Sequence, residues 1–379
     1  MKGSIITFLI ITVSFQGLSR QSPYAYSEIF KRKVIKAGID STLLKVDDFT
    51  IRLNDSIKSD KKIKIKYLGC GGFYIGDHYS GLMIDPYFSH FSMGQILFKR
   101  MNTIPGNVEK GLRSVKKDIY DRVEGVFAAH AHYDHLMDIP HIFENYLNPE
   151  NKPKVYSSET GARISRTFLD PDESIVSFPK ADSLGQVLDT IYLNNRRIRV
   201  FPISTNHAPH FLFLKFAGAK LKDRHIRKFE QHNYSRGSWW KEGENYAFLI
   251  DFLDDQGKKE LRIYLQSSAS SGRGGFLPPE MLDEDQEKID LLILGGASFH
   301  NVKNYPDGLY NNLGSPEKLI ICHWEDFFSD YRHPWRKQVT ATKIHKLILH
   351  VHDKLLPWKE DGKEQFFLPM PGIHIDVQY

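Results

Sequence analysis

The strongest constraint on this fold is an apolar segment that ends abruptly in four potential metal ligands. Residues Val126 to Ala129 lead directly into His130-Ala131-His132-Tyr133-Asp134-His135. Two histidines separated by one residue point to the same side of an extended chain, and imidazole and carboxylate groups are typical ligands of Zn²⁺. The sequence therefore predicts a buried strand that delivers a metal site. The alternative, a polar turn of solvated histidines, is disfavoured because such clusters usually handle a metal or a proton.

Other strand-like apolar segments of the chain also end in residues that can bind a metal. Asp85, His207, His210 and His323 each follow one of them. His207 and His210 lie in the same loop, so His207 is the first choice of ligand and His210 the alternative. Loops at one edge of a sheet converge, and these side chains are therefore expected to form one site with the histidine motif.

The spacing of apolar residues predicts the remaining elements. Alternating or continuous apolar runs indicate strands, and Pro202 is expected to end the strand that begins at residue 197. The predicted strands are 62–67, 73–75, 82–84, 123–129, 154–157, 197–201, 211–216, 246–252, 261–265, 289–294 and 318–322. The predicted helical segments are 27–37, 108–117, 136–146, 158–163 and 336–354.

The amino-terminal residues indicate export. Lys2, a short apolar run from Ile5 to Val13 and small residues after it are typical of a signal peptide, here assigned to residues 1–19. The expected location is periplasmic or secreted, and an N-terminal membrane anchor is the alternative. Residues 20–60 are expected to form an N-terminal extension packed on a single domain, residues 61–379. The formal net charge of +5 is mild and gives no reason to expect nucleic-acid binding.

Two segments interrupt the predicted domain, at about 88–120 and 220–244. The second segment is rich in basic and aromatic residues. It is either a solvated connection or a lid that grips an anionic or acyl substrate. Arg236, Trp239 and Trp240 are the candidate lid residues.

The chain has two cysteines, Cys70 and Cys322. Each follows an apolar run, and both are expected to be small core residues. A disulfide between them is the alternative, because an exported protein meets oxidising conditions.

The motifs and their order resemble the metallo-β-lactamase superfamily from about Ile63 to His323. The run from Gly69 to Ile75 and the pair His323-Trp324 look most like the branch of sugar-lactone hydrolases and N-acylphosphatidylethanolamine phospholipase D. This resemblance implies an α/β fold, a four-layer αββα sandwich, and a hydrolase with one or two metal ions. By position, it implies one ion held by His130, His132 and His207 and a second held by Asp134, His135 and His323, with Asp85 supporting the ligands.

One position departs from the family pattern. The family usually has an aspartate that bridges both ions after the strand at 261–265, but Gln266-Ser267-Ser268 stands there. Without that carboxylate, two dications repel each other more strongly. We therefore expect one firmly held Zn²⁺ and a weak or absent second ion, with Mn²⁺ or Fe as alternative metals. A degenerate member of the fold that binds a metal or ligand without turnover is the alternative function.

The expected activity is metal-dependent hydrolysis by a metal-bound hydroxide. Asp134 would orient the water or take its proton, and His323 would stabilise the developing oxyanion if the second ion is missing. The expected bond is an ester, a lactone or a phosphodiester in a small-molecule or lipid-like substrate. A lipid-like substrate would bring peripheral contact with a membrane.

Overall fold

The strands of the chain form two sheets. The computed structural model describes residues 43–45, 47–53, 61–113, 120–169, 174–209, 221–270, 277, 288–328, 344–356 and 365–379. Within these residues, the strands are divided equally between two eight-stranded sheets. The predicted signal peptide, the helix at 27–37, the strand at 211–216 and His210 lie outside the described residues.

The first sheet carries the histidine motif. Strands β3, β4 and β5 form an antiparallel meander, and β5 to β8 run parallel to one another. The strand order is β2-β16-β3-β4-β5-β6-β7-β8. The bounds are β2 Phe49–Arg52, β16 His374–Gln378, β3 Lys62–Gly69, β4 Gly72–Gly76, β5 Gly81–Ile84, β6 Val123–Phe127, β7 Lys154–Ser157 and β8 Ile175–Ser177.

The second sheet supplies the other strand ends that lead to the site. Strands β9 to β12 are antiparallel, whereas β12 to β15 are parallel. The strand order is β1-β15-β14-β13-β12-β11-β10-β9. The bounds are β1 Leu44–Lys45, β15 Phe366–Pro369, β14 Leu319–Cys322, β13 Leu291–Gly295, β12 Lys259–Gln266, β11 Asn245–Leu253, β10 Ile198–Thr205 and β9 Ile191–Tyr192.

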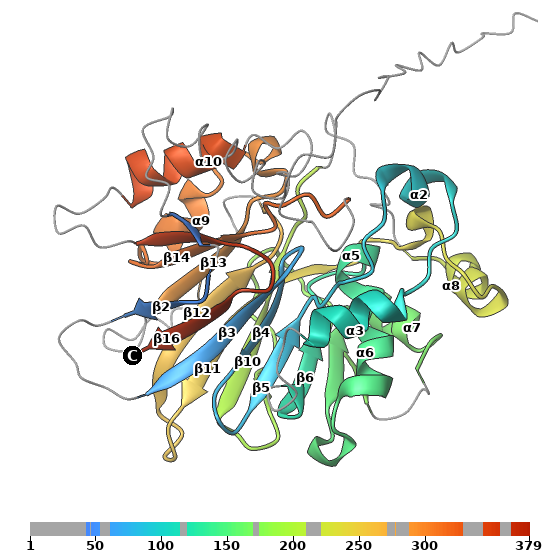
Figure 1. The fold of residues 1–379 in the computed structure, drawn as a ribbon, viewed down its shortest axis with the longest axis horizontal. Helices are drawn as coiled ribbons and strands as arrows, with labels where there is room; N and C mark the ends of the chain where they lie inside the picture. Colours follow the sequence, from blue (N-terminus) through green and yellow to red (C-terminus); the bar gives the residue numbers. More distant parts are fainter. Residues whose placement is uncertain are drawn as a thin grey trace, which may run out of the picture.

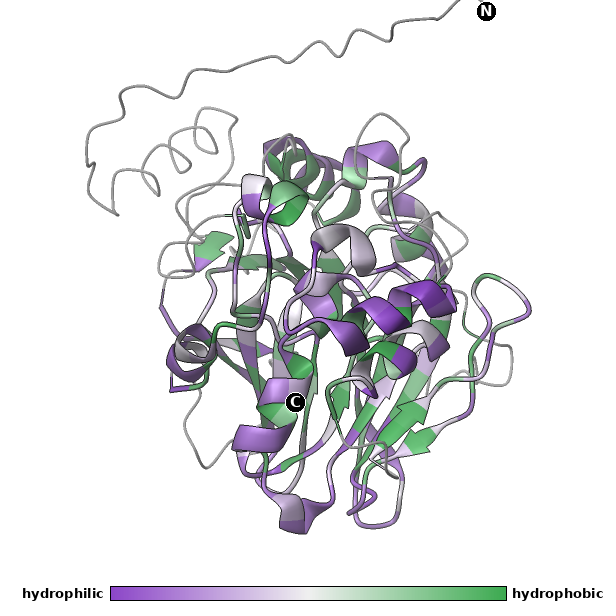
Figure 2. Cartoon of the chain, turned by 90° about the vertical axis from the view of Figure 1, so that its right-hand side faces the viewer, coloured by the Kyte–Doolittle hydropathy of each residue, from purple (hydrophilic) through white to green (hydrophobic). Residues whose placement is uncertain are grey.

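The two sheets pack face to face and helices cover their outer faces (Figure 1). One hydrophobic cluster joins Phe73 and Ile75 of the first sheet to Phe248 and Leu265 of the second. This layering confirms the predicted αββα sandwich. Hydrophobic residues follow the strands, while much of the helical surface is hydrophilic (Figure 2). The helices are α2 Met93–Phe98, α3 Pro105–Arg113, α5 Tyr133–Leu136, α6 Ile139–Tyr146, α7 Glu159–Ser165, α8 Asp223–Gln231, α9 Asp307–Asn312 and α10 Ile344–His350.

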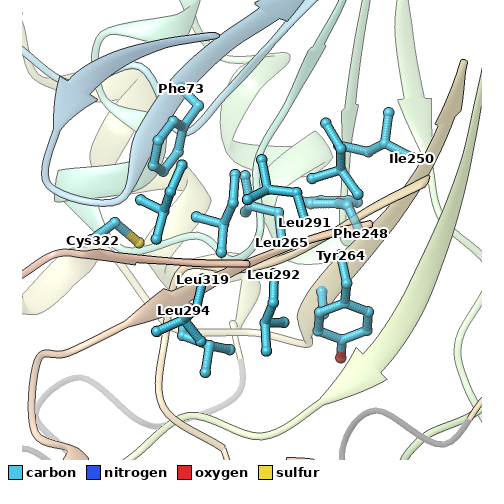
Figure 3. Close-up of a cluster of buried hydrophobic side chains, with 14 of the residues drawn as sticks. Phe73, Phe248, Ile250, Tyr264, Leu265, Leu291, Leu292, Leu294, Leu319 and Cys322 are labelled. Atoms are coloured by element: carbon cyan, nitrogen blue, oxygen red, sulfur yellow. The ribbon is translucent and has the colours of Figure 1, made fainter. Parts of the chain in front are cut away.

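The strand periodicity is visible in the core of the second sheet. Leu265 and Leu291 point to one side of the sheet, toward Phe73, whereas Tyr264, Leu292 and Leu294 point to the other side (Figure 3). All of these side chains are buried, because this sheet has the first sheet on one face and helices on the other.

Cys322 belongs to this hydrophobic cluster and is fully buried (Figure 3). Its prediction as a small core residue is confirmed. Cys70 and Cys322 are both free and buried, so the disulfide alternative is wrong.

Pro202 does not end its strand, and the prediction of a break there is wrong. Strand β10 continues to Thr205, with Pro202 opposite Phe248 of β11. The N–H and C=O of one residue in a strand point to the same side. At Pro202 this is the side away from β11, where its carbonyl accepts a hydrogen bond from the N–H of Leu188 at 2.8 Å. The missing N–H therefore removes no hydrogen bond between β10 and β11.

Four short strands near the chain ends were not predicted. Strands β1 and β2 come from the predicted N-terminal extension, and β15 and β16 come from the carboxyl terminus. Each sheet receives one strand from each end, so the edges of both sheets are completed by residues far apart in sequence. No helix among the described residues is long and apolar enough to cross a membrane.

Candidate metal centre

The predicted ligands meet where strands of the two facing sheets end. Asp85 follows β5 and His130 follows β6, and these two strands are parallel neighbours in the first sheet. His207 and His323 follow β10 and β14 of the second sheet. The rings of His130 and His207 are 4.7 Å apart between centroids, and those of His135 and His323 are 5.5 Å apart. The ends of these four strands therefore lie close together in the structure.

The motif divides between two clusters because its backbone changes conformation at His132. Strand β6 ends at Phe127, the chain then bends at residues 129, 130 and 132, and α5 begins at Tyr133 after an extended His132 with φ −68° and ψ 155°. His130 and His132 consequently face one cluster. Asp134 and His135 turn with the helix toward the other.

The first cluster consists of His130, His132 and His207. One ring nitrogen of each lies within 4.8 Å of the other two. His130 Nε2 and His132 Nδ1 are only 2.9 Å apart. His207 Nδ1 lies 2.7 Å from the carbonyl oxygen of Ala208, which places the proton on Nδ1 and leaves Nε2 as the nitrogen with a lone pair. Three imidazoles in this arrangement fit a metal ion.

The second cluster is centred on one carboxylate oxygen, Oδ2 of Asp134. Cys70 Sγ and His135 Nε2 are each 3.7 Å from this oxygen, and His323 Nε2 is 3.9 Å from it. All four residues are buried, with at most 7% of each residue's surface exposed. Cys70, Asp134 and His323 each offer a ligand atom within 4.8 Å of the other two. Burial, reinforced by the negative charges of Asp134 and Glu325, raises the pKa of the Cys70 thiol.

Asp85 fixes the second cluster from behind. Its Oδ1 accepts a hydrogen bond from the backbone N–H of Ala129 at 2.7 Å, and its Oδ2 accepts one from Ser267 Oγ at 2.8 Å. His135 Nδ1 also lies 2.8 Å from Oδ2, so that His135 Nε2 faces Asp134. Burial lowers the pKa of His135, but the charges of Asp85 and Asp134 outweigh it, and the net pKa is raised above 6.5.

The three residues at the bridge position are held by protein groups. Ser267 Oγ donates to Asp85, and Gln266 Nε2 donates to the carbonyl of Ser268 at 2.9 Å. Gln266 Oε1 accepts a hydrogen bond from Tyr264 at 3.2 Å. In place of a bridging carboxylate, this run therefore provides the Ser267 hydroxyl, which holds Asp85 in position.

Cys70 is a buried residue of the hydrophobic core, as predicted, but it also lies beside Asp134 in the site, which was not predicted. Gly69, Cys70 and Gly71 all have left-handed backbone conformations, with φ of 94°, 52° and 79°. A Cβ at Gly71 would lie 2.9 Å from Ser267 Cβ, so this turn packs directly against the site. The sequence contained one signal for this turn, a cysteine between two glycines at the end of a strand, because glycines there indicate left-handed backbone.

A buried carboxylate, Glu325, connects Cys70 to His323. It accepts hydrogen bonds from the backbone N–H of Cys70 and from Tyr67 Oη, the latter at 2.6 Å. Tyr67 Oη in turn accepts the backbone N–H of His323 at 2.8 Å. Burial raises the pKa of Glu325, although its hydrogen bonds act in the opposite direction. Both Cys70 and His323 are non-glycine residues with positive φ, and this network holds them there.

The two predicted insertions pack together beside the motif. Met101 pairs with Ser235, and the N–H of Ala131 donates to the carbonyl of Glu242 at 3.0 Å. Trp239 and Trp240 are only 7% and 2% exposed, and both contact the ring of Phe229 in α8. The two indoles are therefore packing residues of this unit. Arg236 is exposed, and its role as a lid residue stays a prediction.

The chain resembles solved structures, but its sequence matches no known family. No protein-family model and no curated protein matches the chain. The metallo hydrolase Igni18 from Ignicoccus hospitalis aligns with TM-score 0.45 and 14% identity, over 84% of this chain and 100% of its own. A possible metal-dependent hydrolase from Veillonella parvula gives 0.46 and 12%, over 83% and 99%. The isothiocyanate hydrolase from Delia radicum gut bacteria gives 0.43 and 14%, over 82% and 98%.

Because each of these TM-scores is below 0.5, the likeness carries no conclusion about function. The resemblance to the branch of sugar-lactone hydrolases and N-acylphosphatidylethanolamine phospholipase D stays a prediction.

Proposed function

We propose that this chain is a metal-dependent hydrolase that acts at the two adjacent clusters. The observation that carries the proposal is the first cluster, in which His130, His132 and His207 place three ring nitrogens within 4.8 Å of one another at a sheet edge. A second cluster with a carboxylate and further imidazoles lies beside it, and the rings of His130 and His135 are 4.0 Å apart between centroids. Such a pairing of ligands with an acid–base group is what metal-assisted hydrolysis requires.

A metal ion bound here would supply a Lewis acid that activates water and polarises a carbonyl or phosphoryl oxygen. Asp134 is placed to orient the attacking water and to accept its proton, because its carboxylate oxygen lies 3.7–3.9 Å from Cys70, His135 and His323 in the second cluster. His323 is placed to hydrogen-bond the developing oxyanion if the second cluster holds no ion. The imidazole-rich first cluster suits Zn²⁺, with Mn²⁺ and Fe as the alternatives.

The unit formed by α2 and α8 supports an anionic substrate. Burial lowers the pKa of Lys241, and the nearby charges of Lys228 and Arg224 lower it further. The pKa of His225 is lowered by burial and by the same group of cations. Positive charges that repel one another in this way are relieved by an anion. A phosphodiester or an acidic ester therefore suits this surface, and a lactone suits the resemblance found in the sequence.

Exposed apolar residues on α2 support a lipid-like substrate and peripheral contact with a membrane. Met93, Leu97 and Phe98 are 47%, 40% and 80% exposed. They belong to the same packed unit as the basic residues of α8, a combination that suits an anionic lipid surface. Export through the predicted signal peptide would give the protein access to such a surface. Sedimentation with anionic and neutral vesicles tests this part, and Phe98→Ser is expected to reduce the bound fraction.

The hydrolase proposal is tested with metal-depleted protein and a substrate panel. The panel contains an aryl ester, a lactone and a phosphodiester, each assayed after addition of Zn²⁺, Mn²⁺ or Fe²⁺. Wild-type protein is expected to regain turnover of at least one class. His132→Ala is expected to lose roughly 100-fold or more, because a direct ligand matters at least as much as its supporting residues. His78→Ala is the matched control, since His78 is exposed in the β4–β5 turn.

Two results would contradict the proposal. Equal turnover by wild-type and His132→Ala protein would remove the first cluster from the chemistry. Bound metal without turnover of any substrate class would instead support the non-catalytic alternative.

A further inference from the structure

We propose that Cys70 is a metal ligand and that its thiolate completes a second ion site with Asp134, His135 and His323. The inference rests on the proposed metal centre, and it assigns a residue that the family resemblance does not supply. It also changes the expectation for the second ion. The missing bridging carboxylate at residues 266–268 predicted a weak site, whereas a thiolate from the turn between β3 and β4 restores an anionic ligand.

In the metal-free protein the Cys70 thiol donates a hydrogen bond to Asp134 Oδ2, whereas the two imidazoles stand at distances that suit a shared ion better than hydrogen bonds. Asp134 Oδ2 is 3.7 Å from Cys70 Sγ, 3.7 Å from His135 Nε2 and 3.9 Å from His323 Nε2. Oxygen–nitrogen hydrogen bonds are about 2.7–3.2 Å long, so the two imidazoles are too distant to donate to this oxygen. Ligand atoms held about 2.0–2.3 Å from a tetrahedral ion lie roughly 3.3–3.8 Å apart. The three distances from Asp134 Oδ2 are close to this second range, and the ligand atoms of Cys70, Asp134 and His323 all lie within 4.8 Å of one another.

The backbone around Cys70 is built to present its side chain at this place. Gly69 and Gly71 flank it with φ of 94° and 79°, and Cys70 itself has a left-handed φ of 52°. The carboxylate of Glu325 accepts the N–H of Cys70 and, through Tyr67, is linked to the backbone of His323. One buried network thus positions two of the proposed ligands, which come from different sheets.

Charge supports the assignment independently of distance. The second cluster contains one carboxylate, that of Asp134, because Asp85 faces His135 and Ser267 instead. A divalent ion with a thiolate and a carboxylate is neutralised, which reduces its repulsion of an ion in the first cluster. Sulfur binding releases the thiol proton to solvent. A thiolate ligand also favours Zn²⁺ over Mn²⁺, because soft ligands select softer ions.

Cobalt substitution gives a direct test, because thiolate ligands produce a charge-transfer absorption band with Co²⁺ in the near ultraviolet. Wild-type protein loaded with Co²⁺ is expected to show this band. Cys322→Ser is the matched control, since Cys322 is the other buried cysteine and lies in the hydrophobic core. The band is expected to persist in Cys322→Ser and to disappear in Cys70→Ser. The number of bound ions is expected to fall from two to one in Cys70→Ser.

X-ray absorption of the Zn²⁺-loaded wild-type protein provides a second measurement that does not depend on whether Cys70→Ser folds. A sulfur neighbour at about 2.3 Å is expected. Absence of sulfur from the zinc environment of the wild-type protein would overturn the inference. Sulfur ligation without turnover of any substrate would contradict the hydrolase proposal alone, whereas turnover with a sulfur-free zinc environment would contradict the Cys70 inference alone.

Discussion

Asp85→Asn separates the role of Asp85 in the metal centre from its role in folding. Asp85 is fully buried and contacts three groups: the N–H of Ala129, the hydroxyl of Ser267 and Nδ1 of His135. Asparagine keeps the size of the side chain and one acceptor oxygen, and it tolerates the left-handed φ of 46° at this position. The backbone cost of the substitution is therefore small.

In the Asp85→Asn protein, the new side-chain amide would meet His135 with a donor where the carboxylate offers an acceptor. His135 then keeps a favourable contact only if its proton moves from Nδ1 to Nε2, which blocks the nitrogen that faces the second cluster. We expect affinity for the second ion to fall about 10- to 100-fold. Loss of one buried contact to a charged group is expected to reduce the free energy of unfolding of the metal-free protein by about 1.5–3 kcal/mol.

Asp138→Asn is the matched control for this experiment. Asp138 is also fully buried and accepts hydrogen bonds from Phe88 N at 2.7 Å, from Ser89 N at 2.8 Å and from Ser89 Oγ at 2.5 Å. Its contacts hold the start of the first insertion instead of a proposed ligand. Asp138→Asn is therefore expected to lower stability with little change in metal affinity. Denaturant unfolding of the metal-free proteins and calorimetric titration with Zn²⁺ measure the two effects. Wild-type affinity for two ions in Asp85→Asn would refute the positioning role.

Two further predictions follow from the same region. The raised pKa of His135 means that its contribution to the stability of the metal-free protein is fully present below 6.5 and is lost as pH rises through the higher folded-state pKa. His135→Gln should therefore flatten the decrease in melting temperature as the pH rises above 6.5, and an unchanged profile would show that another group causes the decrease. Gly71→Ala should lower the free energy of unfolding by about 1–2 kcal/mol, because it adds a Cβ at positive φ against Ser267. A wild-type denaturation midpoint would contradict this packing.

The layers of the fold were predictable because each strand carries its own signal. The alternation in Lys62 to Tyr67 and the continuous apolar residues of Leu291 to Leu294 both correspond to strands, although β3 is more buried than its alternation suggests, with Lys66 only 1% exposed. The same local signals located the ligands at strand ends. Parallel neighbours such as β5 and β6 bring their ends to one edge whatever the sequence between them, so the convergence of Asp85 and His130 followed from fold class.

Strands β15 and β16 could not be derived in the same way. Phe366 to Pro369 and His374 to Gln378 are short, and they become strands because both sheets offer an edge there. Pro202 is the converse case, since a residue that usually ends a strand is tolerated where its missing N–H faces away from β11. Local propensity gives way to the position in the sheet in both cases.

The second cluster shows why position-by-position transfer of ligands from a family is incomplete. Gln266-Ser267-Ser268 stands where the family has a bridging carboxylate, and considered alone this run predicts a weakened site. What an ion requires is negative charge at a suitable distance, whichever strand supplies it. Cys70 is 64 residues from Asp134 in sequence and reaches it across the site. Its turn is held by Glu325, and a Cβ at Gly71 would meet Ser267 at 2.9 Å. The small side chain at 267 and the thiol at 70 are therefore coupled through packing, because a larger residue at 267 would displace the turn that positions Cys70.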